Sequence, residues 1–210
     1  MRIKVCGITQ RQQAETLGEM GITFCGFIFY KKSPRYVLSS IHKEEIKKIT
    51  NINKVGVFVN APAEDVLQIV DDCRLQAVQL HGDETPHYCG MISNYISVIK
   101  AFRIGGALPV ETYINDYFDV ADFYLFDTSG NDYGGTGKKF DWNLLNNISI
   151  NKPYFLSGGI APGDEEIIKQ FQQQPAAKNL FALDINSKFE VSPGIKDIEK
   201  ISAFVNVLKE

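Results

Sequence analysis

Polar side chains that could move a proton stand where short apolar runs end. Cys6 closes "RIKVC" (2–6), and Asp127 closes "FYLFD" (123–127). A thiolate can accept a proton and a carboxylic acid can donate one, so a facing pair would support acid–base chemistry. Taken alone, Cys6 would be interpreted as a buried core thiol, with a metal ligand or half of a disulfide as less favoured alternatives. Asp127 alone is equally typical of a helix cap or an Asx-turn.

Two further side chains at strand ends are suited to binding. Arg35 in "KKSPRYV" could pair with a carboxylate through two parallel hydrogen bonds and pack on a ring, although an isolated Arg is more often a surface residue. His81 in "QLHG" shares an inward strand face with Gln79. A satisfied core histidine is the alternative to a binding role.

Two loops near the end of the chain are suited to an anion. Gly158 and Gly159 in "LSGGIAP" let the backbone approach a ligand, and Asp184 and Ser187 lie in "LDINS". In barrels of parallel strands, loops after strands seven and eight often bind phosphate through backbone N–H groups. The alternative is a pair of ordinary tight turns.

A long polar loop follows Asp127. The stretch "TSGNDYGGTGKKFDW" contains four glycines, Gly130, Gly134, Gly135 and Gly137. Long loops at the end of a strand are commonly lids or binding loops, and a flexible connection is the alternative. A lid would bury Asp127, and burial would raise the pKa of its carboxyl group.

The elements that must position these residues alternate along the chain. Eight apolar runs are predicted strands, at 2–6, 24–29, 54–59, 77–81, 97–102, 123–127, 153–157 and 180–184. Helices are predicted at 11–20, 40–50, 62–74, 86–95, 163–174 and 196–209, with weaker ones at 110–118 and 141–147. Within 62–74, the residues Val66, Ile69, Val70 and Cys73 share one face, as in a helix that packs on a sheet.

Eight strands with crossovers predict a single (β/α)8 barrel over residues 1–210. A doubly wound open sheet is the rival, but it usually has a Gly-rich turn after its first strand, and "CGIT" is not one. Chemistry in a barrel lies at the C-terminal strand ends. Those ends read Cys6, Tyr30, Asn60, His81, Arg103, Asp127, Ser157 with Gly158, and Asp184. These residues are expected to meet at one mouth.

Alternation along the first strand places Lys4 and Cys6 inside the barrel and Ile3 and Val5 against the helices. A cation below a thiol favours the thiolate, which is the form that acts as a base. The sequence therefore predicts that Lys4 lowers the pKa of Cys6.

Bulk composition narrows the function classes. The chain has 210 residues, 44% hydrophobic and 22% charged, which disfavours disorder, and its net charge of −3 gives no basic footprint for nucleic acid. Four cysteines without C-x-x-C spacing favour free thiols in a reducing cytoplasm and disfavour a zinc site. The start "MRIKVC" does not resemble a signal peptide, and no apolar run reaches membrane-span length.

Seven motifs together resemble the phosphoribosylanthranilate isomerase family of tryptophan biosynthesis. They are "KVCGIT", "GFIFYKKSPRYV", "VGVFVN", "VQLHGDE", "FDTSGNDYGGTGKKFDW", "LSGGIAP" and "ALDINS", in order from residue 4 to residue 187. The resemblance implies one (β/α)8 barrel and an Amadori rearrangement of N-(5-phospho-β-D-ribosyl)anthranilate to 1-(2-carboxyphenylamino)-1-deoxyribulose 5-phosphate. No metal and no organic cofactor are implied.

The resemblance also implies residue roles. Cys6 would be the general base and Asp127 the general acid, while Arg35 would meet the anthranilate carboxylate. The phosphate would lie around four residues: Gly158, Gly159, Asp184 and Ser187. One position departs from the family pattern, because Lys188 stands where a small residue is usual and could hinder or assist phosphate binding.

Three rival functions were weighed. A related isomerase of histidine biosynthesis would have an Asp where Cys6 stands. Another phosphate-binding barrel, such as an aldolase or a tryptophan synthase α-like lyase, is the second rival, and an aldolase would need an inward lysine on the strand that holds Phe123, Leu125 and Asp127. A silent phosphosugar-binding scaffold would need no acid–base pair. The expected partner is a small phosphosugar, with no nucleic acid and no membrane, and the expected state is a monomer or a homodimer in the cytoplasm.

Overall fold

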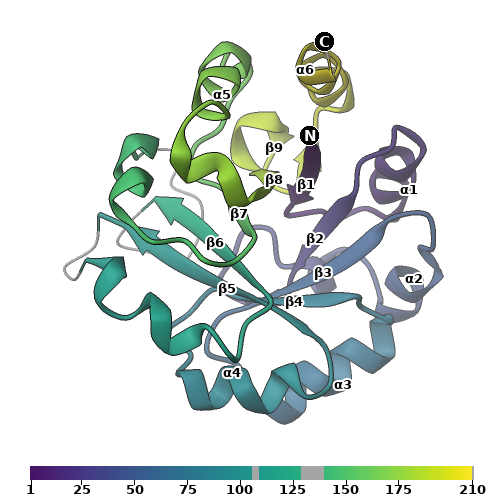
Figure 1. The fold of residues 1–210 in the computed structure, drawn as a ribbon. Helices are drawn as coiled ribbons and strands as arrows, with labels where there is room; N and C mark the ends of the chain where they lie inside the picture. Colours follow the sequence, from purple (N-terminus) through teal and green to yellow (C-terminus); the bar gives the residue numbers. More distant parts are fainter. Residues whose placement is uncertain (106–108, 129–139, 210) are drawn as a thin grey trace.

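The computed structural model, which describes residues 1–105, 109–128 and 140–209, is a closed barrel of eight parallel strands that neighbour one another in chain order (Figure 1). This confirms the predicted (β/α)8 fold. The strands are β1 (Arg2–Cys6), β2 (Phe24–Ile28), β3 (Asn53–Phe58), β4 (Ala77–Leu80), β5 (Ser97–Ile104), β6 (Phe123–Thr128), β7 (Tyr154–Leu156) and β8 (Leu180–Ile185). Each overlaps its predicted range.

Helices surround the barrel (Figure 1). They are α1 (Arg11–Glu19), α2 (Lys43–Lys48), α3 (Ala63–Cys73), α4 (Pro86–Ser93), α5 (Glu165–Phe171) and α6 (Ile198–Lys209). The two weaker predictions form short 3-10 turns instead: η2 (Val110–Thr112) with η3 (Ile114–Tyr117), and η4 (Trp142–Asn147). Further 3-10 turns are η1 (Val37–Ser39), η5 (Pro175–Asn179) and η6 (Ser187–Phe189). Asn and Asp compete with the helical backbone for hydrogen bonds, which explains why 110–118 and 141–147 form no α-helix.

Strand alternation divides the core into two layers. Ile3 and Val5 pack outward against the helices, as predicted. The barrel interior is filled by a second apolar cluster of buried residues: Val55, Ala77, Ile99, Ala101, Leu125, Phe155 and Ala182. A barrel interior of this kind is a packed core and not a pore, so the barrel is closed beneath its C-terminal mouth. The buried charges of β1 and β8 lie beside each other in register, Lys4 opposite Asp184.

A short antiparallel hairpin follows β8 and was not predicted. It consists of β9 (Glu190–Ser192) and β10 (Ile195–Lys196). The turn contains Pro193 and Gly194, and Gly194 has a φ of 87° that favours glycine. An added Cβ at Gly194 would lie 2.7 Å from Thr9, so the hairpin packs closely on the loop after β1.

All four cysteines are free, as the sequence predicted, and all four are buried. In the part of the chain that the structure describes, no helix combines the length and the apolar character needed to cross a bilayer.

Candidate active site

One pocket gathers most of the polar strand ends. Its lining residues are Cys6, Ile28, Tyr30, Ser33, Arg35, Val57, Val59, Gln79, His81, Asp127, Ser157, Gly158, Gly159, Ile160, Asp184, Asn186 and Ser187. The eight residues singled out as catalytic or substrate-binding from the sequence are all among them. Asn60 and Arg103 do not line it. Asn60 accepts the N–H of Asp83, and Arg103 pairs loosely with the Asp83 carboxylate at 3.6 Å.

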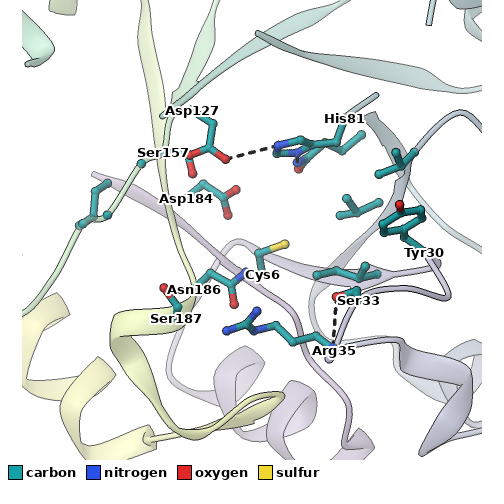
Figure 2. A pocket seen from close by; sticks show the side chains of 17 residues that line it. Cys6, Tyr30, Ser33, Arg35, His81, Asp127, Ser157, Asp184, Asn186 and Ser187 are labelled. Carbon is teal, nitrogen blue, oxygen red and sulfur yellow. Dashed lines mark hydrogen bonds and ion pairs between the residues drawn. The ribbon is translucent and has the colours of Figure 1, made fainter. Parts of the chain in front are cut away.

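Cys6 ends β1 with its thiol directed into the pocket (Figure 2). Space for the sulfur comes from Gly26 on the neighbouring strand, because a Cβ there would lie 2.8 Å from Sγ. Burial raises the pKa of the Cys6 thiol, and the nearby charges of Lys4 and Lys196 only partly oppose this. Lys4 therefore acts in the predicted direction, but desolvation outweighs it, so the pKa of the thiol is raised overall rather than lowered.

Lys4 is held by Asp184. Its Nζ donates to both carboxylate oxygens at 2.9 and 3.0 Å, and the two side chains are 0% and 5% exposed. Burial lowers the pKa of Lys4, but Asp184 and Cys6 raise it further, so the ammonium stays charged below the thiol. Asp184 lines the pocket, but its carboxylate is engaged by Lys4.

We expect Lys4→Met to lower kcat/KM near neutral pH and to move its alkaline limb to higher pH, because the thiol loses a cation that lowers its pKa. The change also leaves Asp184 buried without its partner, which should cost about 3–5 kcal/mol of stability. Lys54→Met is the matched control, since Lys54 is 2% exposed but donates to the backbone oxygens of Ile46 and Cys73. A Lys4→Met profile identical to the parent's would contradict the prediction.

Asp127 lies one residue before the end of β6 and begins a chain of contacts that runs through His81, which follows β4, to Gln79 within β4. His81 Nε2 lies 3.3 Å from Asp127 Oδ2 (Figure 2). On the other side of the ring, His81 Nδ1 lies 2.6 Å from Gln79 Nε2. The N–H of Thr128 donates to Asp127 Oδ1 at 2.8 Å. Burial raises the pKa of Asp127, but the contacts with His81, Thr128 and Ser157 outweigh it and hold that pKa below its usual value. The predicted upward shift is therefore wrong.

The loop expected to cover Asp127, with its four glycines, lies outside the described residues. The loop after β4, which carries His81, is held from below by a buried ion pair. Lys100 Nζ donates to Glu84 Oε2 at 2.8 Å and to the backbone oxygen of Gly82, and the N–H of Gly82 donates back to Glu84. The Asp127–His81 contact is thus supported from β5 as well as β6.

The two candidate phosphate loops line the pocket between Asp127 and Cys6. Gly158 and Gly159 have φ values of 91° and 70°, which only glycine adopts readily. Ser187 opens η6 beside the same pocket. Lys188, the departure from the family pattern, is exposed and is not among the lining residues, so its side chain does not close the pocket.

Gly158→Ala should reduce stability by about 1–3 kcal/mol and raise KM for a phosphate-bearing substrate. An added Cβ would lie 2.5 Å from Thr128 Oγ1 and 3.1 Å from Thr128 N, beside Asp127. Gly163→Ala is the matched control, because Gly163 has a φ of 93° but open space around its Cβ position. Denaturant unfolding and KM measure the two effects. Equal costs in both variants, with KM unchanged, would show that the contact with Thr128 is unimportant.

Arg35 makes the two-pronged carboxylate contact that its sequence context suggested, but with a residue of this chain. Its Nε donates to Glu190 Oε1 at 2.8 Å and its Nη2 donates to Glu190 Oε2 at 2.7 Å. The hydrogen bond and charge of Glu190 raise the pKa of Arg35 despite partial burial. Glu190 belongs to the unpredicted hairpin, so its part in the site was missed.

Within the described ranges, no group of three or more His, Cys, Asp or Glu side chains is arranged to hold a metal ion. The expectation that no metal and no cofactor are needed stays a prediction.

A thiol and a carboxyl group therefore face one polar pocket from strands β1 and β6, three steps apart around the barrel through β8 and β7. The loops after β7 and β8 lie between them. This arrangement defines an acid–base enzyme of the (β/α)8-barrel class, with a pocket suited to a small anionic ligand.

Comparisons identify the family. Residues 3–207 match the family model of N-(5'-phosphoribosyl)anthranilate isomerase. A curated relative of that name from Parabacteroides distasonis is 38% identical over 98% of this chain and 92% of its own length. One from Phocaeicola vulgatus is 36% identical over 100% and 98%. The chain belongs to the N-(5'-phosphoribosyl)anthranilate isomerase family.

Solved structures agree. The phosphoribosyl anthranilate isomerase of Thermus thermophilus superimposes with a TM-score of 0.83 at 30% identity, covering 100% of this chain and 98% of that one. Another similar structure, at 32% identity and a TM-score of 0.79 over 100% and 98% of the two chains, is an isomerase in complex with reduced 1-(o-carboxyphenylamino)-1-deoxyribulose 5-phosphate. The rival barrels considered from the sequence are therefore not favoured.

Proposed function

We propose that this chain converts N-(5-phospho-β-D-ribosyl)anthranilate to 1-(2-carboxyphenylamino)-1-deoxyribulose 5-phosphate, with Cys6 as general base and Asp127 as general acid. The observation that carries this proposal is the meeting of the two groups at one pocket in a chain of this family. An Amadori rearrangement needs one proton donated to the ring oxygen and one removed from C2, at opposite sides of the sugar.

The proposed rearrangement proceeds by proton transfers between the substrate and the two side chains. Asp127 protonates the ring oxygen as the C1–O bond breaks, and the nitrogen lone pair forms an iminium ion with C1. The Cys6 thiolate then removes the C2 proton, giving an enolamine. C1 gains a proton as the enol O–H loses one, which gives the ketone product. Return of a proton from the Cys6 thiol to the Asp127 carboxylate, through solvent, restores the starting forms. The thiol and carboxyl groups supply and accept single protons, so no oxidant or reductant is required.

Substrate binding is proposed to use both ends of the pocket. The phosphate would be taken up by the backbone around Gly158, Gly159 and Ser187, which line the wall between the two catalytic groups. The anthranilate carboxylate would pair with Arg35, and His81 would support the sugar end through its contact with Asp127. Asp184, engaged by Lys4, would face the sugar rather than the phosphate, because two anions repel.

The wider expectations stay predictions. A monomer or a homodimer and a cytoplasmic location are expected from the sequence. One related structure, from Thermotoga maritima, is described as monomers generated from a dimeric isomerase, which is a property of that protein.

Turnover of phosphoribosylanthranilate by the purified chain, without added metal, tests the proposal. We expect conversion to the ketone product, which can be followed by the change in the spectrum of the anthranilate group. Tight binding of the reduced product analogue without any turnover would instead support a silent phosphosugar-binding barrel.

A further inference from the structure

A charged cluster joins Arg35 to the hairpin of β9 and β10. Glu190 Oε1 accepts from three donors: Arg35 Nε at 2.8 Å, Lys196 Nζ at 2.6 Å and the N–H of Gly194 at 3.1 Å. Lys196 Nζ also donates to Asn186 Oδ1 at 2.7 Å. The side chains of Lys196, Glu190 and Arg35 are 0%, 4% and 12% exposed. The cluster is therefore built into the fold rather than lying on the surface.

The cluster fixes the position of the guanidinium group. Glu190 holds the Nε–Nη2 edge of Arg35 with two parallel hydrogen bonds, which set the plane of the group. Gly7 leaves room for the Arg35 side chain to lie in this position, since an added Cβ there would lie 2.7 Å from Arg35 Cδ and 2.7 Å from Asn186 Oδ1. The Nη1–Nη2 edge is the one left to face a ligand.

Two basic side chains share one carboxylate in this cluster. Arg35 and Lys196 both donate to Glu190, and burial lowers the pKa of Lys196 although the charge of Glu190 opposes this. Hydrogen bonds and charges of these side chains outweigh burial and hold the pKa of Glu190 below its usual value. Arg35 and Asn186 line the pocket, whereas Glu190 and Lys196 are not among its described lining residues.

We propose that Glu190 is a positioning residue that sets the preference of this site for substrates with a carboxylate on their aromatic ring. This inference rests on the proposed function, in which Arg35 pairs with that carboxylate. A guanidinium held in one plane pairs with a carboxylate without losing further side-chain freedom, so preorganisation strengthens binding.

An effect of net charge and an effect of positioning predict opposite changes in ligand affinity when Glu190 is replaced, so the two can be distinguished by experiment. Glu190→Gln removes a negative charge, so an effect of net charge would tighten binding of a carboxylated ligand. Loss of positioning would weaken it. Glu190→Asp keeps the charge but shortens the side chain by one methylene, so it should lose the parallel hydrogen bonds with no change in net charge.

The experiment measures dissociation constants for the reduced product analogue and for the same compound with hydrogen in place of the ring carboxylate. We expect Glu190→Gln and Glu190→Asp each to reduce the ratio of the two affinities about tenfold, mostly through the carboxylated compound. With the substrate itself, KM should rise while kcat stays close to the parent value. Glu15→Gln is the matched control, because it breaks another Arg–carboxylate contact, Arg11 to Glu15 at 2.8 Å, on the outside of the barrel.

The outcomes separate the positioning role from the proposed function. Tighter binding in Glu190→Gln, or an equal loss for both compounds, would overturn the positioning role. If Arg35→Met loses the carboxylate preference while both Glu190 variants keep it, the positioning role is wrong and the proposed function stands. If Arg35→Met keeps the preference, the proposed carboxylate contact is wrong, and the role of Glu190 is wrong with it.

Discussion

Replacing Cys6 by alanine is expected to lower kcat by about 10²–10⁴-fold, the usual contribution of a general base. The thiol lies at the end of β1 in the pocket, and Gly26 leaves space beside its sulfur. No other cysteine lines that pocket among the described residues, so the chain offers no substitute thiol there. Cys6→Ser should be similarly slow, because a serine hydroxyl is a far weaker acid than a thiol and would rarely be ionised.

Binding of the reduced product analogue separates chemistry from structure. Cys6→Ala should bind it with nearly the parent affinity, since the loss concerns a proton transfer. Cys25→Ala is the matched control: Cys25 lies on the neighbouring strand β2, is fully buried and packs in the outer apolar layer. It should lose stability, within the usual 0.5–3 kcal/mol or so for a core change, and keep its turnover. Parent-like turnover in Cys6→Ala would make Cys6 a core thiol.

The strand pattern made most of this site predictable. Strand ends in a parallel barrel meet at one mouth, so Cys6, His81 and Asp127 could be grouped before any contact was known. Alternation placed Lys4 below Cys6 with equal ease. Such inferences depend only on the alternation of side chains along a strand and on the order of the strands, and both can be read from the sequence.

The residues that were missed depend on contacts distant in sequence. Glu190 and Lys196 reach Arg35 through a hairpin whose signal was available: "EVSPGIK" places a Pro-Gly turn between two short runs. Their contact with Arg35, 155 residues away in the case of Glu190, could not be read from the sequence, because the hairpin lies outside the eight-strand order that brings other distant residues together.

The net pKa shifts of Cys6 and Asp127 could not be predicted, for a related reason. The sequence shows which charged groups are near one another, but the size of the desolvation cost depends on how completely each group is buried. Cys6 is buried deeply enough that Lys4 does not compensate, and Asp127 receives enough hydrogen bonds to overcome its burial. At rest, Cys6 is therefore favoured as the thiol and Asp127 as the carboxylate, whereas the proposed chemistry uses the thiolate and the carboxylic acid.

Replacing Asp127 by asparagine should lower kcat by a similar 10²–10⁴-fold or so, because an amide of the same shape has no carboxyl proton to donate. The contacts to His81 and Thr128 can largely persist, so binding of the product analogue should change little. Asp122→Asn is the matched control at the opposite end of the same strand, where Asp122 accepts from the N–H of Val98. It should leave turnover unchanged.

The pH dependence of kcat/KM gives the more specific result. The pKa of Asp127 is lowered and the pKa of Cys6 is raised. The reactive form of the enzyme has Asp127 protonated and Cys6 ionised. Between the two pKa values this form is a small fraction of the enzyme, and the fraction does not change with pH. The parent profile should therefore be flat through neutral pH and fall at both ends. In Asp127→Asn only the thiol titrates, so the residual activity should rise about tenfold per pH unit until Cys6 ionises. A flat profile in Asp127→Asn would mean that Asp127 is not the proton donor, because its removal would then leave the balance between acid and base unchanged.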